Sequence, residues 1–239
     1  MRNGRAIAAL AAAAIALGSA GYRIADEPQS STAAGPPAPA APVGLADATE
    51  VHGLLGQAAI VPELEVPGYE RSCSKGDGCV FGPAWSDDVT VAGGHNGCDT
   101  RNDTLAAQLD NAVFEPGTED CVVTAGELVD PYTGELEGFE RGEGSTIHID
   151  HVVPLSRAWS FGASDWTEEQ RRNFANDPIN LLATSASANQ SKGDKGPGEW
   201  MPDHDTCGYA ATYLTVVTTY ELAITEADRD VLADACPVQ

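Results

Sequence analysis

Basic side chains are scarce in this chain of 239 residues, which carries 13 lysines and arginines against 36 aspartates and glutamates. The formal net charge is −23. Proteins that hold nucleic acid through many phosphate contacts use lysine and arginine, whose binding releases counterions. The overall charge therefore argues against a general polyanion-binding protein, and any contact with nucleic acid has to be local.

A hydrophobic run long enough to span a membrane is also missing. The N-terminal run AIAALAAAAIAL (residues 6–17) is shorter than the roughly 20 residues of a spanning helix. It follows two arginines and precedes the small residues GSA, as in a secretory signal peptide. We therefore predict a cleaved signal peptide at 1–20. The alternative is an uncleaved membrane anchor. The mature protein is expected to be secreted, without stable membrane association after cleavage.

No Cys-x-x-Cys pair occurs, which disfavours a zinc ribbon or a thiol redox motif. An even number of cysteines behind a signal peptide indicates disulfides instead. Six cysteines allow 15 pairings, and closeness along the chain favours three of them: Cys73–Cys79, Cys98–Cys121 and Cys207–Cys236. Residues 21–45 are rich in Ala, Pro and Ser and are expected to form a disordered linker. Residues 46–239 then remain for one domain.

Several elements can be predicted from local patterns. Residues 99–112 suggest a helix capped by Asp99 or Thr100, and 121–142 suggest a short hairpin followed by turns. Capping-box patterns predict helices over 168–175 and 226–236, and helical spacing of aromatic residues predicts another over 206–221. Those aromatic residues are expected in the core.

The chain has five histidines, and two of them fall in the stretch IHIDHVVPL (residues 147–155). Alternation predicts a strand in which Ile147 and Ile149 share one face while His148 and Asp150 share the other. A second strand over 179–184 and a helix opened by Ser185 or Ser187 follow. Carboxylate and amide oxygens suit one hard divalent cation, and a neutral imidazole beside them can accept a proton from water.

These segments resemble the HNH endonucleases, the ββα-metal nucleases. The matching motifs are IDHVVPL, NDPINLLAT and ANQSKGDK, with GCDTRND, GELVDPYTG and GEWMP resembling the secreted bacterial branch. The resemblance implies an α+β fold with a ββα-metal core at 145–201, added helices and a short hairpin, stapled by disulfides. It also implies cleavage of phosphodiester bonds that leaves 5′-phosphate and 3′-hydroxyl ends.

The resemblance also implies residue roles. His151 would be the general base, Asp150 would bind the metal, and Asn180 would steady the loop around His151. Asn189 holds the last motif position, where its carbonyl favours Mg²⁺ or Mn²⁺ over Zn²⁺. His148 has no fixed role in the family and is either an auxiliary metal ligand or a plain surface histidine.

Cations near the motif are candidates for contacts with phosphate. Residues 148–201 carry five basic and seven acidic side chains, so this segment is nearly neutral within a very acidic protein. We interpret it as a local face for an anionic ligand, against the alternative of chance. Lys192 is a candidate for stabilising charge on the reacting phosphate, or else an ordinary helix-end cation. Arg101, Arg157 and Lys195 are candidate nucleic-acid contacts, although Arg157 would also suit an ion pair with Asp150.

The leading hypothesis is a secreted, monomeric, Mg²⁺- or Mn²⁺-dependent endonuclease with little sequence specificity, with DNA favoured over RNA as substrate. A second hypothesis is a non-catalytic extracellular binding domain on a degenerate nuclease scaffold, which the acidic charge favours. A third is a Zn²⁺ hydrolase that uses His148 and His151, although the sequence offers no evident third nitrogen ligand nearby.

Overall fold

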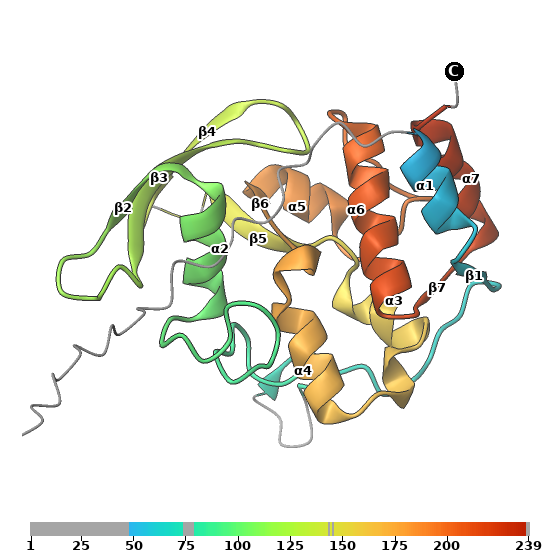
Figure 1. Ribbon diagram of the computed structural model, residues 1–239, viewed down its shortest axis with the longest axis horizontal. Coiled ribbons are helices and arrows are strands. Elements are labelled where there is room, and N and C mark those ends of the chain that lie inside the picture. The colour runs from blue at the N-terminus through green and yellow to red at the C-terminus, as the bar shows by residue number, and fades with distance from the viewer. Residues whose placement is uncertain (1–47, 74–78, 143, 145, 238–239) are drawn as a thin grey trace, which may run out of the picture. The chain divides into compact units, whose positions relative to one another are not determined.

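Helices and three small sheets make up the part of the chain that the computed structural model describes, residues 48–73, 79–142, 144 and 146–237 (Figure 1). The predicted α+β class is confirmed. The predicted signal peptide and linker lie outside the described residues. None of the helices described is long and apolar enough to cross a membrane.

The central element is a two-stranded antiparallel sheet of β5 (Ile147–His151) and β6 (Leu181–Ser185). The predicted alternation is present, because Ile147 and Ile149 pack into one apolar cluster with Leu181 and Ala183. Helix α2 (Thr100–Gln108) contributes Leu105 to the same cluster. One face of the β5–β6 sheet is thus buried against α2, as the layers of a folded domain require.

Side chains of α2 also form hydrogen bonds with backbone groups of β5 and β6. Gln108 donates from Nε2 to the carbonyl of Leu181 at 2.9 Å and accepts from the amide of Ala183 at 2.7 Å. Arg101 donates to the carbonyl of Ile147 at 3.3 Å. Buried backbone groups need such partners, so α2 fixes both strands in place.

Helix α5 (Ala186–Lys192) follows β6 directly and packs on β5. Ser185 caps it by accepting a hydrogen bond from the amide of Ala188, as one of the two predicted caps. Strand, strand and helix therefore occur in that order around the motif residues. Asp150 and His151 lie on β5, and Asn189 and Lys192 lie on α5.

Four short helices connect β5 to β6: α3 (Leu155–Ser160), η2 (Ala163–Asp165), α4 (Glu168–Asn176) and η3 (Pro178–Asn180). The predicted capping box of α4 is confirmed, with reciprocal bonds between Thr167 and Gln170. Phe174 of α4 is fully buried against Phe81 and Trp166. This connection brings the backbone of α4 beside the end of β5.

The C-terminal elements are α6 (Thr206–Thr219), β7 (Ala223–Ile224) and α7 (Glu226–Ala235), close to the predicted ranges. Tyr209 and Tyr213 are buried, as expected for core residues. Helix α1 (Ala48–Leu55) packs on α6 and α7, and β1 (Ala59–Ile60) pairs in parallel with β7. These two N-terminal elements were not predicted.

The region after α2 differs from the prediction. The helix predicted over 99–112 is α2, which ends before residue 112. In place of a short hairpin the structure has a three-stranded antiparallel sheet of β2 (Asp110–Phe114), β3 (Val123–Val129) and β4 (Leu136–Glu140). The predicted cap Asp99 is present, but the helix ends at Gln108 because Leu109 takes an extended conformation. Pairing of β2 with β3 overrides the weak helix propensity of DNAVF.

Three disulfides join Cys73 to Cys79, Cys98 to Cys121 and Cys207 to Cys236. This is the pairing that closeness along the chain favoured. The last bridge ties the start of α6 to the end of α7. Each bridge restricts the unfolded chain and thereby stabilises the folded one.

We expect the double variant Cys207→Ser/Cys236→Ser to lose roughly 2–4 kcal/mol of unfolding free energy, because that bridge closes the longest loop. Its cysteines are 29 residues apart, against 6 for Cys73–Cys79. Equilibrium unfolding in urea measures the loss, with Cys73→Ser/Cys79→Ser as the short-loop comparison. An unchanged midpoint and slope in the first variant would contradict the expectation.

Candidate active site

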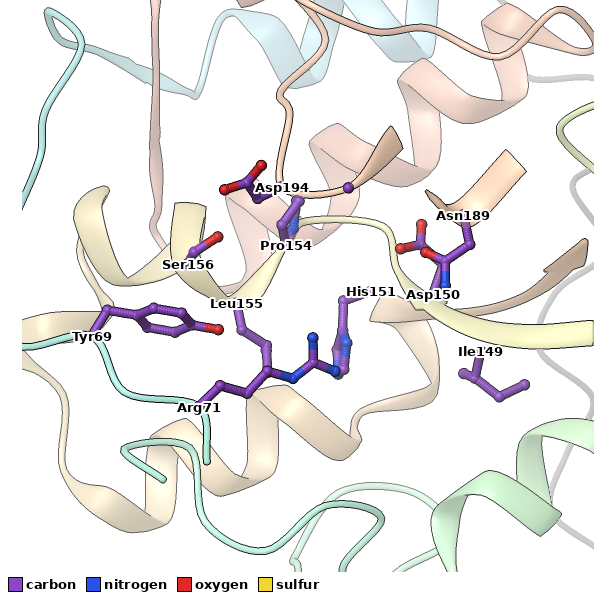
Figure 2. A pocket seen from close by; sticks show the side chains of 11 residues that line it. Tyr69, Arg71, Ile149, Asp150, His151, Pro154, Leu155, Ser156, Asn189 and Asp194 are labelled. Carbon is purple, nitrogen blue, oxygen red and sulfur yellow. The ribbon is translucent and has the colours of Figure 1, made fainter. Parts of the chain in front are cut away.

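A cavity of about 570 Å³ opens beside the end of β5. Figure 2 shows Asp150 and Asn189 at one end of it, Tyr69 and Ser156 at the other, and His151 and Arg71 between them. The remaining lining residues are Ile149, Pro154, Leu155, Gly193 and Asp194. Three residues of the predicted site, Asp150, His151 and Asn189, therefore share one pocket.

Asp150 is held by two neighbours and is only 5% exposed. The hydroxyl of Tyr132 donates to its Oδ2 at 2.6 Å, and Lys192 Nζ lies 2.9 Å from Oδ2 and 3.1 Å from Oδ1. Burial raises the pKa of Asp150, and the ammonium of Lys192 acts in the opposite direction. Because the pair is in direct contact, we describe Asp150 as a carboxylate beside an ammonium.

Lys192 is committed to neighbours within the fold. Its ammonium donates to Oδ1 of Asp150 and to the carbonyl of His151 at 2.8 Å, it forms an ion pair with Oδ2 of Asp150, and its side chain is fully buried. Lys192 does not line the pocket, and the carboxylate that it contacts is that of Asp150.

Tyr132 is placed by a second buried carboxylate, Asp130. Asp130 accepts hydrogen bonds from the amide of Tyr132 at 2.8 Å, from the hydroxyl of Thr184 at 2.7 Å and from the amide of Ser185 at 3.0 Å. These bonds lower the pKa of Asp130 although its burial opposes them. The turn after β3 is thereby fastened to the junction of β6 and α5, next to Asp150.

His151 is 8% exposed, and its ring stacks on Trp85 with the ring centroids 6.0 Å apart. Its Nε2 lies 2.8 Å from the carbonyl oxygen of Ala175. A carbonyl only accepts, so Nε2 carries the proton and Nδ1 keeps its lone pair. Burial lowers the pKa of His151 to about 4, which keeps the imidazole neutral at pH 7.

Asn180 is the last residue of η3, directly before β6; it is fully buried and holds the turn that follows His151. Its Oδ1 accepts from the amide of Val153 at 2.8 Å and its Nδ2 donates to the carbonyl of the same residue at 3.3 Å. Its own carbonyl accepts from the amide of Val152 at 2.9 Å. The side chain thus hydrogen-bonds to the backbone of Val153 and does not line the pocket.

Asn189 on α5 contacts His148 on β5. The amide Nδ2 of Asn189 lies 3.1 Å from Nδ1 of His148. An amide nitrogen only donates, so His148 accepts this bond and fixes the rotation of the Asn189 amide. Its carbonyl oxygen then remains as the atom able to bind a cation. His148 itself is not among the pocket-lining residues.

The family of C-terminal domains of GmrSD restriction endonucleases matches residues 99–235, which is more than half of the chain. The chain belongs to this family. An uncharacterized secreted protein of Arthroderma benhamiae is 33% identical over 201 residues, which cover 82% of this chain and 88% of that protein. No solved structure matches the chain.

The GmrSD-type domain contains all the motif residues of β5, β6 and α5, but Tyr69, Arg71 and Trp85 lie before the matched range. Sequence reasoning missed these three residues. Arg71 is exposed, and Figure 2 shows its guanidinium directed toward the ring of His151. The only sequence signal was a Tyr, an Arg and a Trp in a stretch otherwise rich in Gly and Cys, which does not by itself identify a pocket.

The other predicted phosphate contacts lie elsewhere in the GmrSD-type domain. Arg157 is 8% exposed, forms an ion pair with the buried Asp228 and stacks over Phe161. Arg101 supports the edge of β5, and Lys195 is exposed at the end of α5, where it donates to the carbonyl of Ser191. None of these three lines the pocket, and we leave them out of the proposed substrate contacts.

Proposed function

We propose that this protein is a secreted, metal-dependent endonuclease that hydrolyses phosphodiester bonds of nucleic acid with little sequence specificity. The observation that carries the proposal is the meeting of Asp150, His151 and Asn189 in one pocket of a domain from a restriction-endonuclease family. A carboxylate, a neutral imidazole and an amide are the groups that a one-metal phosphodiesterase requires.

We further propose that the enzyme is a nuclease of the HNH type. Its support is the order β5, β6, α5, with the proposed base at the end of the first strand and Asn189 on the helix. The register pairs His151 with Leu181, directly after Asn180, so the middle motif residue lies beside the base. Asn180 then holds the turn after His151 through backbone contacts.

The residues present suit a hard divalent cation, Mg²⁺ or Mn²⁺. Asp150 and Asn189 each offer an oxygen from the same end of the pocket, and oxygen donors favour such ions over Zn²⁺. One ring nitrogen of each histidine is already engaged, Nδ1 of His148 with Asn189 and Nε2 of His151 with Ala175. A bound cation would polarise the phosphate and stabilise its developing negative charge.

The chain's own residues divide the remaining work. Nδ1 of His151, with its lone pair free, accepts a proton from the attacking water. Trp85 and the carbonyl of Ala175 fix the plane of the imidazole. Arg71 is the one cation that lines the pocket among the described residues, which places it to contact an anionic phosphate oxygen.

Secretion agrees with the three disulfides and with the Arthroderma protein, whose name describes it as secreted. The substrate is then extracellular nucleic acid, with DNA favoured over RNA, and the protein acts as a monomer.

Incubation of the purified protein with supercoiled plasmid and with RNA, in Mg²⁺ or Mn²⁺ and with or without EDTA, tests the proposed function. We expect cleavage that requires the metal. Binding without cleavage would instead support a non-catalytic nucleic-acid-binding domain. Cleavage in the presence of EDTA would show that the reaction needs no metal ion.

The alanine variants of the two asparagines are expected to lose activity for different reasons. Asn189→Ala should weaken Mn²⁺ binding, and excess Mn²⁺ should partly restore turnover. Asn180→Ala should lower turnover with Mn²⁺ affinity nearly unchanged, because its contacts are to backbone. Asn189→His should keep activity and shift preference toward Zn²⁺ or Ni²⁺. Titration of metal against cleavage rate measures all three, and the reverse pattern for the two alanine variants would exchange the assignments of Asn180 and Asn189.

A further inference from the structure

We propose that Lys192 is a built-in counter-ion of Asp150, and that a divalent cation and the substrate phosphodiester consequently bind this site together and not independently. The inference rests on the proposed function and extends it from which groups bind to how their binding is coupled. It starts from the position of the lysine, which the mechanism above does not use directly.

The carboxylate of Asp150 is electrically balanced before any metal arrives. The Lys192 ammonium lies 2.9 Å from one of its oxygens and 3.1 Å from the other, with no exposed surface. Tyr132 adds a hydrogen bond at 2.6 Å. In a buried setting the charges of such a pair cancel at close range, so a dication approaching Asp150 gains little net attraction.

The neighbouring donors bring no further negative charge. Asn189 is a neutral amide, and His148 is engaged with it. Across the described part of the chain, no group of three or more His, Cys, Asp or Glu side chains could hold a metal ion. The second acidic residue of the pocket, Asp194, lies apart from Asp150 in Figure 2. A bound dication alone would therefore leave about two positive charges uncompensated, beside Arg71.

A phosphodiester supplies the missing charge and the missing oxygens. Its anionic oxygens complete the coordination of a hard cation, as substrate phosphates do for Mg²⁺ in many enzymes. Each ligand then raises the affinity of the other by the same factor, because binding free energies are reciprocal. Couplings of this kind are typically about 5- to 150-fold.

Electron paramagnetic resonance of Mn²⁺ bound to the full protein measures this coupling without turnover. We expect the Mn²⁺ dissociation constant to fall at least about fivefold when a charged, cleavage-resistant dithymidine phosphorothioate is added. The neutral dithymidine methylphosphonate should leave the dissociation constant unchanged. Equal Mn²⁺ affinity with and without the charged dinucleotide would overturn the proposal.

Lys192→Met tests the assignment to the lysine. Removing the ammonium should raise Mn²⁺ affinity in the absence of dinucleotide by about fivefold or more, and the dinucleotide should then add less. Lys195→Met is the matched control, because it removes the same charge from an exposed site three residues away. Equal Mn²⁺ affinities in the two folded variants would overturn the role of Lys192. If Lys192→Met does not fold, the wild-type comparison of the two dinucleotides decides alone.

Failure of this inference and failure of the proposed function give different results. A protein that cleaves plasmid but binds Mn²⁺ equally well with and without the phosphorothioate is a nuclease without the coupling. A protein that shows the coupling but never cleaves plasmid or RNA has the metal–phosphate site without the proposed activity.

Discussion

Replacing His151 with alanine is expected to lower turnover by roughly 10²–10⁴-fold while the protein stays folded. The expectation follows from the ring's surroundings: Nε2 is committed to the carbonyl of Ala175, so Nδ1 is left as a proton acceptor. Single-turnover cleavage of plasmid at saturating Mg²⁺ measures the loss. No concentration of metal should restore the rate, because the missing part is the base.

His95→Ala is the control for the loss of an imidazole. His95 is largely exposed, and its Nε2 lies 3.9 Å from Oδ1 of Asp88, which is also exposed. The His95→Ala variant should cleave plasmid at the wild-type rate. A folded His151→Ala protein with wild-type turnover would remove His151 from the mechanism.

Replacing Asp150 with alanine is expected to abolish cleavage and, in addition, to cost roughly 3–5 kcal/mol of unfolding free energy. The stability loss arises because Lys192 is fully buried and would lose its counter-ion. Urea unfolding of the purified variant gives the free energy, and Mn²⁺ titration gives the loss of metal binding.

The double variant Asp150→Ala/Lys192→Met separates the two effects. Removing both charges should recover most of the stability, because no unpaired charge remains buried, whereas cleavage should stay absent. Asp194→Ala, at an exposed residue of the same pocket, should change stability little. A double variant no more stable than Asp150→Ala would contradict the ion-pair explanation.

Much of the site could be predicted because its signals are local. The alternation of Ile147 and Ile149 with His148 and Asp150 fixes which side chains face the core, and β5 shows that alternation. Capping patterns at Thr167 and Thr225 located two helices for the same reason, since a cap acts over three or four residues.

The contacts that complete the site are long-range and leave no local pattern. Tyr132 reaches Asp150 from 18 residues away, and its own position depends on Asp130 contacting Thr184, 54 residues along the chain. Trp85 and Arg71, which both lie outside the described helices and strands, approach the ring of His151. Only the folded arrangement shows that these residues share a pocket.

Charge counting along the sequence does not show which cations reach the pocket. Of the five cations in residues 148–201, Lys192 and Arg157 are buried in ion pairs, and Arg171 donates to backbone carbonyls of Val80 and Trp166. In this structure these three side chains contact other parts of the fold, and none of them lines the pocket. The cation that lines the pocket, Arg71, lies outside that segment.

Cleavage of plasmid DNA in ¹⁸O-labelled water, followed by mass spectrometry of the fragment ends, tests the central claim most directly. If His151 activates a water molecule for attack on phosphorus, every new 5′-phosphate carries one ¹⁸O atom and every new 3′ end is an unlabelled hydroxyl. Unlabelled 5′ ends, 3′-phosphate ends, or intact plasmid in the presence of Mg²⁺ and Mn²⁺ would contradict the account.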